Sequence, residues 1–280
     1  MRRASPYSLL LTLHSLLFDM LRPKITPCLL VKDKGLVKTI NFQKPKYVGD
    51  PINAVKIFNE KEVDELIVLD IDATTENREP DYNMIEHLAE ECRMPLCYGG
   101  GVKSVEQVKR IIGLGVEKVA ISSAALENPA LVRAAADRVG NQSVVVVLDV
   151  RKRLIANKYD VFIHNGKMKT EKDPVALAMQ MESLGVGEIV INSIDHDGVM
   201  KGYDLALVEK IREAINVPLT VLGGAGTLQD IGQLISKYGI IGCAAGSLFV
   251  FKGMYKAVLI NYPNRGEKDA LIENNYIFSN

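Results

Sequence analysis

Four aspartates follow short apolar runs in this chain of 280 residues, in positions where a carboxylate could exchange protons with a ligand: Asp70, Asp149, Asp195 and Asp197. A carboxylate held in a partly buried site has a raised pKa and can serve as a general acid or base. Asp70 and Asp195 could equally accept hydrogen bonds from a helix end or a loop. Asp149 ends the apolar run 144–149 and has no such simple structural explanation. We therefore predict that Asp149 carries the chemistry.

Glycines and serines form a second set of candidate residues, and this set occurs twice. Gly99 and Gly223 each end an apolar run and are 124 positions apart, and Ser122 and Gly246 are also 124 positions apart. Glycine lets backbone N–H groups approach a ligand, and a helix that begins there adds partial positive charge, which favours phosphate. The alternative is that each glycine only serves a tight turn. We predict two phosphate sites, one from Gly100, Gly101, Ser122 and Ser123, the other from Gly198, Gly224, Gly246 and Ser247, with Asp197 beside the second.

Charged residues precede several of the same apolar runs: Lys24, Glu65, Lys118 and Glu188. If the runs are parallel strands of a barrel, these four side chains lie together at the end opposite the aspartates. Residues at that end of a barrel usually serve stability. Taken alone, the pattern therefore indicates a ring of salt bridges.

The composition limits the classes of ligand. Lys plus Arg equals Asp plus Glu at 34 each, so no excess charge attracts nucleic acid or an anionic membrane, and neither is predicted as a partner. The four cysteines and four histidines have no metal-ligand spacing, and we predict no metal and no cofactor. Because three of the cysteines fall inside apolar runs, we interpret them as reduced core residues of a cytoplasmic protein.

Short apolar runs alternate with amphipathic stretches such as 105–112. The runs are 25–31, 66–70, 95–98, 119–122, 144–149, 189–192, 218–222 and 241–245. Runs rich in Val, Ile and Leu that are separated by helical patterns indicate parallel strands buried on both faces. Eight such units, with the doubled spacing of 124, predict a single α/β domain: a (β/α)₈ TIM barrel built from two half-barrel repeats.

The two ends of the chain do not follow this pattern. Residues 1–19 have a charged start and an apolar stretch, as a signal peptide does, but no cleavage site follows and the stretch is too short to span a bilayer. We expect a disordered or non-native extension with Met20 as the true start, or alternatively an interfacial or partner-binding helix. The barrel is predicted over 20–263, and 264–280 as a C-terminal tail.

Several motifs resemble the cyclase subunit of imidazole glycerol phosphate synthase, the HisF family. They are PCLLVKD (27–33), GDP (49–51), DELIVLD (64–70), YGGGV (98–102), GEIVINSIDHDG (187–198) and GGAG (223–226), and the resemblance runs from about Met20 to Pro263. Members of this family are (β/α)₈ barrels that take ammonia from a separate glutaminase subunit docked at the barrel bottom. They combine the ammonia at the top with a bis-phosphorylated nucleotide intermediate.

The resemblance implies roles for individual residues. The four charges listed above match the family's ammonia gate, in which the position of Lys24 is normally arginine. Asp149 matches the second catalytic aspartate, and Lys38 matches a lysine of the mobile loop that closes over substrate. Leu30 stands where the family has its first catalytic aspartate, and Ser122 replaces an asparagine near one phosphate.

Leucine cannot transfer a proton, so the histidine-pathway reaction should be impaired by roughly 10²–10⁴-fold. The segments LLVKD (29–33) and GSLFVF (246–251) resemble a paralogous branch that works with a second glutaminase-like subunit in acetamidino modification of a surface-polysaccharide sugar, as in lipopolysaccharide. Three alternatives stay open. They are an authentic histidine-pathway cyclase, a non-catalytic scaffold that channels ammonia for a glutaminase, and a sugar-phosphate isomerase, which would need both aspartates and no gate.

Overall fold

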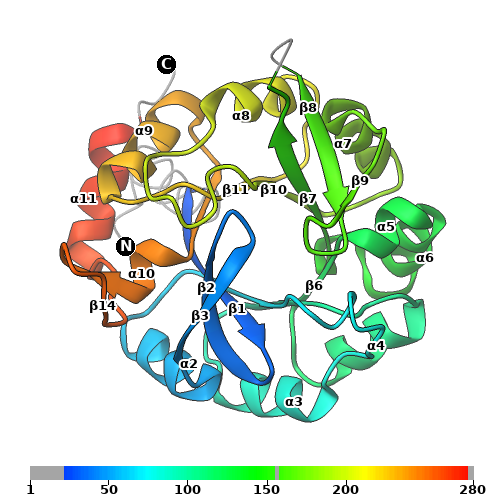
Figure 1. The fold of residues 1–280 in the computed structure, drawn as a ribbon, viewed down its shortest axis with the longest axis horizontal. Helices are drawn as coiled ribbons and strands as arrows, with labels where there is room; N and C mark the ends of the chain where they lie inside the picture. Colours follow the sequence, from blue (N-terminus) through cyan, green and yellow to red (C-terminus); the bar gives the residue numbers. More distant parts are fainter. Residues whose placement is uncertain (1–21, 155–157, 277–280) are drawn as a thin grey trace, which may run out of the picture.

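The computed structural model describes residues 22–154 and 158–276, and the prediction for residues 1–19 lies outside this range. Within it, eight strands form a closed parallel barrel, as predicted (Figure 1). Each pairs with the next, and the last pairs with the first. In order they are β1 (Lys24–Lys32), β4 (Leu66–Asp70), β5 (Leu96–Gly99), β6 (Lys118–Ile121), β7 (Val144–Lys152), β10 (Glu188–Ser193), β11 (Leu219–Leu222) and β12 (Gly242–Ala245).

Helices surround the barrel and pack their apolar faces on the strands. Many begin at side-chain caps: Ser104 forms a capping box with Gln107, and Asp50 and Asp173 each cap a helix that has proline in its first turn. The helices are α2 (Pro51–Glu60), α3 (Tyr82–Glu91), α4 (Val105–Gly113), α5 (Ser123–Glu127), α6 (Ala130–Val139), α7 (Pro174–Ser183), α8 (Leu205–Arg212), α9 (Leu228–Tyr238), α10 (Ser247–Val250) and α11 (Arg265–Asn275), with a 3₁₀ turn at Asn141–Ser143.

Two antiparallel hairpins extend the barrel at its mouth. β2 (Gly35–Ile40) and β3 (Gln43–Gly49) continue from β1, and β8 (Tyr159–Ile163) and β9 (Met168–Lys169) continue from β7. Figure 1 shows the β2–β3 hairpin lying across the mouth. Since β1 and β7 are the first strands of the two halves, the hairpins follow the same internal repeat as the strands. A third small hairpin, β13 (Phe251–Lys252) and β14 (Ala257–Val258), follows α10.

The barrel interior is apolar along most of its length. Side chains alternate along a strand, so Glu188, Val190 and Asn192 of β10 face the same side. Glu188 lies at the bottom, Val190 in the middle and Asn192 at the mouth. The interior cluster around Val190 comprises Cys28, Ile67, Cys97, Ala120, Val145, Val147, Leu222 and Ala244. An apolar layer therefore separates the polar bottom from the polar mouth.

The segment predicted as a C-terminal tail contains α11, which packs on α9. Lys268 of α11 is 5% exposed, and its ammonium donates to the carboxylate of Asp64 at 2.6 Å. Asp64 also accepts from the Ile25 backbone N–H at 3.0 Å, directly beside the first strand. In the ranges described above, no helix has the length and apolarity needed to cross a bilayer.

Candidate active site

A pocket of about 330 Å³ opens at the C-terminal ends of the barrel strands. This is the end where (β/α)₈ enzymes place their reactive groups. Of the predicted site residues, the pocket is lined by Asp149, Lys38, Asp197, Gly100, Gly101, Ser122, Ser123, Gly224, Gly246 and Ser247. One fold feature, the carboxyl ends of eight parallel strands, therefore brings together residues that lie far apart in the sequence.

Asp149 forms a polar pair with Asn192 across two neighbouring strands. The two residues are register partners of β7 and β10, and the Asn192 amide donates to Asp149 Oδ1 at 3.0 Å. Burial raises the pKa of Asp149 to about 7, and the hydrogen bond from Asn192 opposes this rise only in part. A carboxyl with a pKa near neutrality can both take and return a proton at physiological pH.

Asn192 itself was not among the predicted site residues. It is 5% exposed, and its Oδ1 is a buried acceptor without a hydrogen-bond partner in the described part of the chain. A buried polar atom left unsatisfied costs free energy, and such atoms often await a ligand or a water. The signal in the sequence was only that this polar residue ends the apolar run 189–192.

Leu30 and Leu69 occupy the opposite side of the mouth. They are register partners of β1 and β4, both line the pocket, and both pack on the apolar interior. Leu30 and Leu69 therefore form an apolar pair on this side of the mouth, opposite the polar pair of Asp149 and Asn192. At the level of these two residue pairs, the mouth is polar on the β7–β10 side and apolar on the β1–β4 side, and Asp70 and Lys38 also line the pocket.

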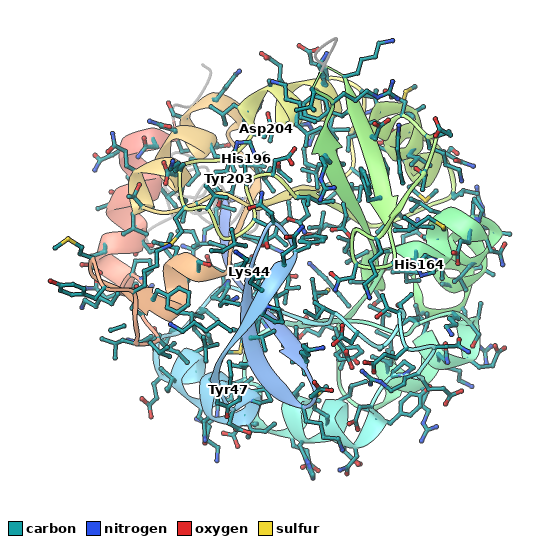
Figure 2. The ribbon with its side chains drawn as sticks, in the orientation of Figure 1. Lys44, Tyr47, His164, His196, Tyr203 and Asp204 are labelled. Carbon is teal, nitrogen blue, oxygen red and sulfur yellow. The ribbon has the colours of Figure 1, made fainter. Side chains whose placement is uncertain are left out.

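The first predicted phosphate cluster is assembled. Gly100 and Gly101 have φ values of +127° and +72°, and a Cβ at Gly100 would clash with the backbone of Asp70. Both therefore need to be glycine for steric reasons as well. Ser123 accepts a hydrogen bond from the His164 backbone N–H at 2.9 Å. Figure 2 shows His164 on the β8–β9 side of the mouth, away from Lys44 on β3.

The second predicted cluster is assembled without Gly198. Gly224, Gly246 and Ser247 line the pocket, whereas Gly198 lies beneath the β2–β3 hairpin, where a Cβ would clash with the carbonyl oxygen of Thr39. Lys38 joins this cluster, because its ammonium would lie 2.6 Å from a Cβ at Gly246. It donates to the Cys28 carbonyl at 2.7 Å, and burial lowers its pKa.

Asp197 fastens the β2–β3 hairpin over the mouth. Its Oδ2 accepts from the Thr39 hydroxyl at 2.7 Å, and Asn41 donates to the Asp195 carbonyl at 3.0 Å. Burial raises the pKa of Asp197, and the bonds from Thr39 and the Phe42 N–H oppose the rise. Because Asp197 also lines the pocket, it connects the hairpin to the pocket wall.

The two remaining aspartates make structural hydrogen bonds. Asp70 accepts from the backbone N–H groups of Asp72 and Ala73 at 3.2 and 3.0 Å, and Arg78 lies 3.4 Å from its other oxygen. Asp195 accepts from the Lys152 N–H at 2.8 Å. Both thus serve the loops, which was the alternative left open for them, whereas the polar partner of Asp149 is the strand residue Asn192.

The four charges at the strand starts meet at the barrel bottom. Lys118 lies 2.7 Å from Glu65 and 2.6 Å from Glu188, and Lys24 lies 3.1 Å from Glu65. Burial would lower the pKa of Lys118, but the two glutamates more than reverse this and the pKa is raised. Thr220, which sequence reasoning missed, donates to the second oxygen of Glu188 at 2.6 Å.

Comparison with known proteins gives the family. The family model for "Histidine biosynthesis protein" matches residues 24–256. A provisionally named imidazole glycerol phosphate synthase subunit hisF3 of Vibrio vulnificus (strain YJ016) is 58% identical over 91% of this chain and 98% of its own length. A provisionally named subunit HisF of Leptospira interrogans is 58% identical over 90% and 99%.

A more distant relative has the same subunit name. The imidazole glycerol phosphate synthase subunit HisF of Lactiplantibacillus plantarum is 41% identical over 83% of this chain and 92% of its own length. The resemblance seen in the sequence motifs is therefore confirmed over most of the barrel. This chain belongs to the histidine biosynthesis protein family, among the HisF-type subunits.

Proposed function

We propose that this chain is an ammonia-using barrel subunit that works with a glutaminase docked at the barrel bottom, and that it serves acetamidino modification of a surface-polysaccharide sugar. The observation that carries the proposal is the one-sided mouth. Asp149 and Asn192 offer a proton-transfer group and a free acceptor on one side, while Leu30 and Leu69 offer neither on the other. Such a mouth is poorly suited to a reaction that needs an acid and a base on opposite sides of its substrate.

Ammonia would enter beside Lys118 and cross the apolar interior around Val190. An apolar passage favours neutral ammonia over ammonium, because burial of an unpaired charge is costly. At the mouth, the free Oδ1 of Asn192 would accept an N–H of the arriving ammonia. Asp149, with its pKa near 7, would take the proton released as the nitrogen bonds to its acceptor.

The two glycine and serine clusters would hold anionic groups of the acceptor molecule. They lie on different strands, the first at the ends of β5 and β6 and the second at the ends of β11 and β12. A ligand that spans them crosses the mouth between Asp149 on one side and Leu30 on the other. A phosphorylated or nucleotide-linked substrate fits this arrangement.

Authentic histidine-pathway cyclisation is the second candidate. It is favoured by the retention of Asp149 and of both clusters, and by the name of the Lactiplantibacillus plantarum relative. It requires another group to replace the proton transfer that Leu30 cannot perform.

The partner requirement is tested with the glutaminase subunit from the same genome. The chain should form a 1:1 complex with it, and glutamine-dependent turnover should appear only in the complex. Lys118→Met should uncouple glutamine hydrolysis from product formation, whereas Lys109→Met, on the exposed face of α4, should not. Full glutamine-dependent turnover by the isolated chain would exclude the proposal.

A further inference from the structure

The β13–β14 hairpin presents large apolar side chains to solvent. Met254 and Tyr255 at its tip are 87% and 91% exposed, and Val258 of β14 and the following Leu259 are 47% and 53% exposed. Folded proteins seldom leave several large apolar side chains together in water without a binding role. The hairpin is short, with two residues in each strand, and the near-complete exposure of Met254 and Tyr255 indicates that its tip projects into solvent.

Lysines surround these apolar side chains. Lys252 and Lys256 flank Met254 and Tyr255, and Lys46 of β3 lies 5.5 Å over the ring of Phe251. These three lysines are exposed, and none forms a salt bridge in the described residues. No acidic residue occurs in 43–47 or 251–259.

The basic–apolar tip, defined as Met254, Tyr255, Val258 and Leu259 with Lys46, Lys252 and Lys256, therefore combines unpaired positive charge with protruding apolar groups. The zero net charge of the whole chain hides this cluster, which is why composition predicted no membrane partner. We propose that the basic–apolar tip docks this protein on an anionic lipid surface. Met254 and Tyr255 enter the interfacial layer while the lysines remain at the headgroups.

The shape of the tip favours lipid over a protein partner. A stable protein interface needs about 800 Å² from each partner and a complementary surface, whereas this hairpin offers a small projection. A lipid interface adapts to such a projection and accepts tyrosine at headgroup depth, and anionic lipids attract unpaired lysines. The contact is peripheral, and it leaves the barrel bottom free for another subunit.

The chain contains no tryptophan, so one introduced tryptophan reports on its own position. Tyr255→Trp should show a blue-shifted emission with vesicles that mix phosphatidylcholine and phosphatidylglycerol, and quenching by brominated lipid. It should show neither with phosphatidylcholine alone. Met179→Trp is the control, because Met179 is 53% exposed on α7, across the barrel from β14 (Figure 1).

Vesicle sedimentation measures the charge contribution. Lys252→Gln with Lys256→Gln should lower the partition coefficient about 30-fold, since each lysine near an anionic surface contributes about a factor of five. Lys109→Gln with Lys210→Gln removes the same charge from exposed helix positions and should change it less than about three-fold.

Three results would overturn the inference. The first is absent binding to anionic vesicles, and the second is binding that the lysine variants of the tip leave intact. The third is a change in the tryptophan emission of Tyr255→Trp with a purified protein and not with vesicles, because the tip would then be a protein interface.

Discussion

The two halves of the barrel mouth share a backbone plan but differ in chemistry. Strand register matches the two halves residue by residue. Ile25 of β1 pairs with β12 in the same way as Val144 of β7 pairs with β6. Leu30 and Asp149 each lie five residues further along these strands, so they occupy equivalent positions. Leu69 and Asn192 are also equivalent, because Leu69 on β4 pairs with Leu30 and Asn192 on β10 pairs with Asp149. Residues of both glycine and serine clusters line the pocket, one cluster from each half. Only one half retains the polar pair that could move a proton.

The barrel bottom shows a related difference. Glu65 and Glu188 occupy equivalent places in the two halves and both are buried. Lys118 binds both of them, whereas its equivalent in the second half is Gly242, as the pairings of Cys97 with Lys118 and of Thr220 with Gly242 indicate. Lys118 thus bridges the carboxylates of both halves at the bottom, whereas at the mouth the Asp149–Asn192 pair belongs to the second half alone.

Asp149→Asn should produce the largest change, because it makes the two sides of the mouth equally unable to transfer a proton. We expect product formation from ammonium salts in the complex to fall about 10²–10⁴-fold. The wild-type rate should rise as pH increases through about 7, where Asp149 loses its proton, and the variant should lack this rise. Asp195→Asn, at a carboxylate that holds the Lys152 N–H, should lose less than about three-fold. Equal losses in the two variants would remove Asp149 from the mechanism.

Lys118→Met tests whether one cation supports both halves of the bottom. The change leaves buried Glu65 with only the exposed Lys24 ammonium and buried Glu188 with only the Thr220 hydroxyl, so the free energy of unfolding should fall by about 3–5 kcal/mol. Lys24→Met is the matched control. Its exposed ammonium binds the same Glu65, and its loss should cost at most about 1 kcal/mol. Urea unfolding measures the free energy of unfolding of both variants. Similar losses in the two would contradict the prediction that Lys118 stabilises both halves more than Lys24 does.

The stability of Asp149→Asn should depend on pH. Burial raises the pKa of the folded carboxyl from 3.8 to about 7, so its contribution to stability is present below pH 3.8 and is lost as pH rises to about 7. Asparagine does not ionise, and the variant should therefore be more stable than the parent at pH 8 by about 1–2 kcal/mol, after allowance for partial solvent exposure. The difference should shrink toward pH 5. A variant that is less stable at pH 8 would show that the carboxylate is satisfied in the fold.

The barrel strands were predictable because their physical signal is strong. Runs such as 144–149 are apolar on both faces, which few other structures allow, and the doubled spacing of the glycines located the halves. The hairpins were not predictable. Five of the seven residues in Gln43–Gly49 are exposed and carry no alternating apolar pattern, and their pairing depends on contacts with β2 and with the 195–197 loop.

The places of site residues in the barrel, though not their roles, were predictable where a charged residue stands next to an apolar run. Asp149 and Lys118 are examples, since a charge beside an apolar run needs a reason. Asn192, Thr220 and Leu69 act through partners on neighbouring strands, and the register that pairs them appears only in the folded barrel. Gly198 shows the reverse case, because its glycine is explained by the close approach of Thr39 and not by a ligand.

Complementation of a histidine-requiring strain that lacks its own cyclase subunit tests the one-sided mouth most directly. The unmodified chain should not support growth, because Leu30 leaves one side of the mouth without a proton-transfer group. Leu30→Asp should restore slow growth if the pocket admits the nucleotide substrate, although a newly buried carboxyl can cost a few kcal/mol of stability. Leu30→Asn should not restore growth, because asparagine has the same shape as aspartate but cannot transfer a proton. Robust growth with the unmodified chain would contradict the account and establish the histidine-pathway reaction as its function.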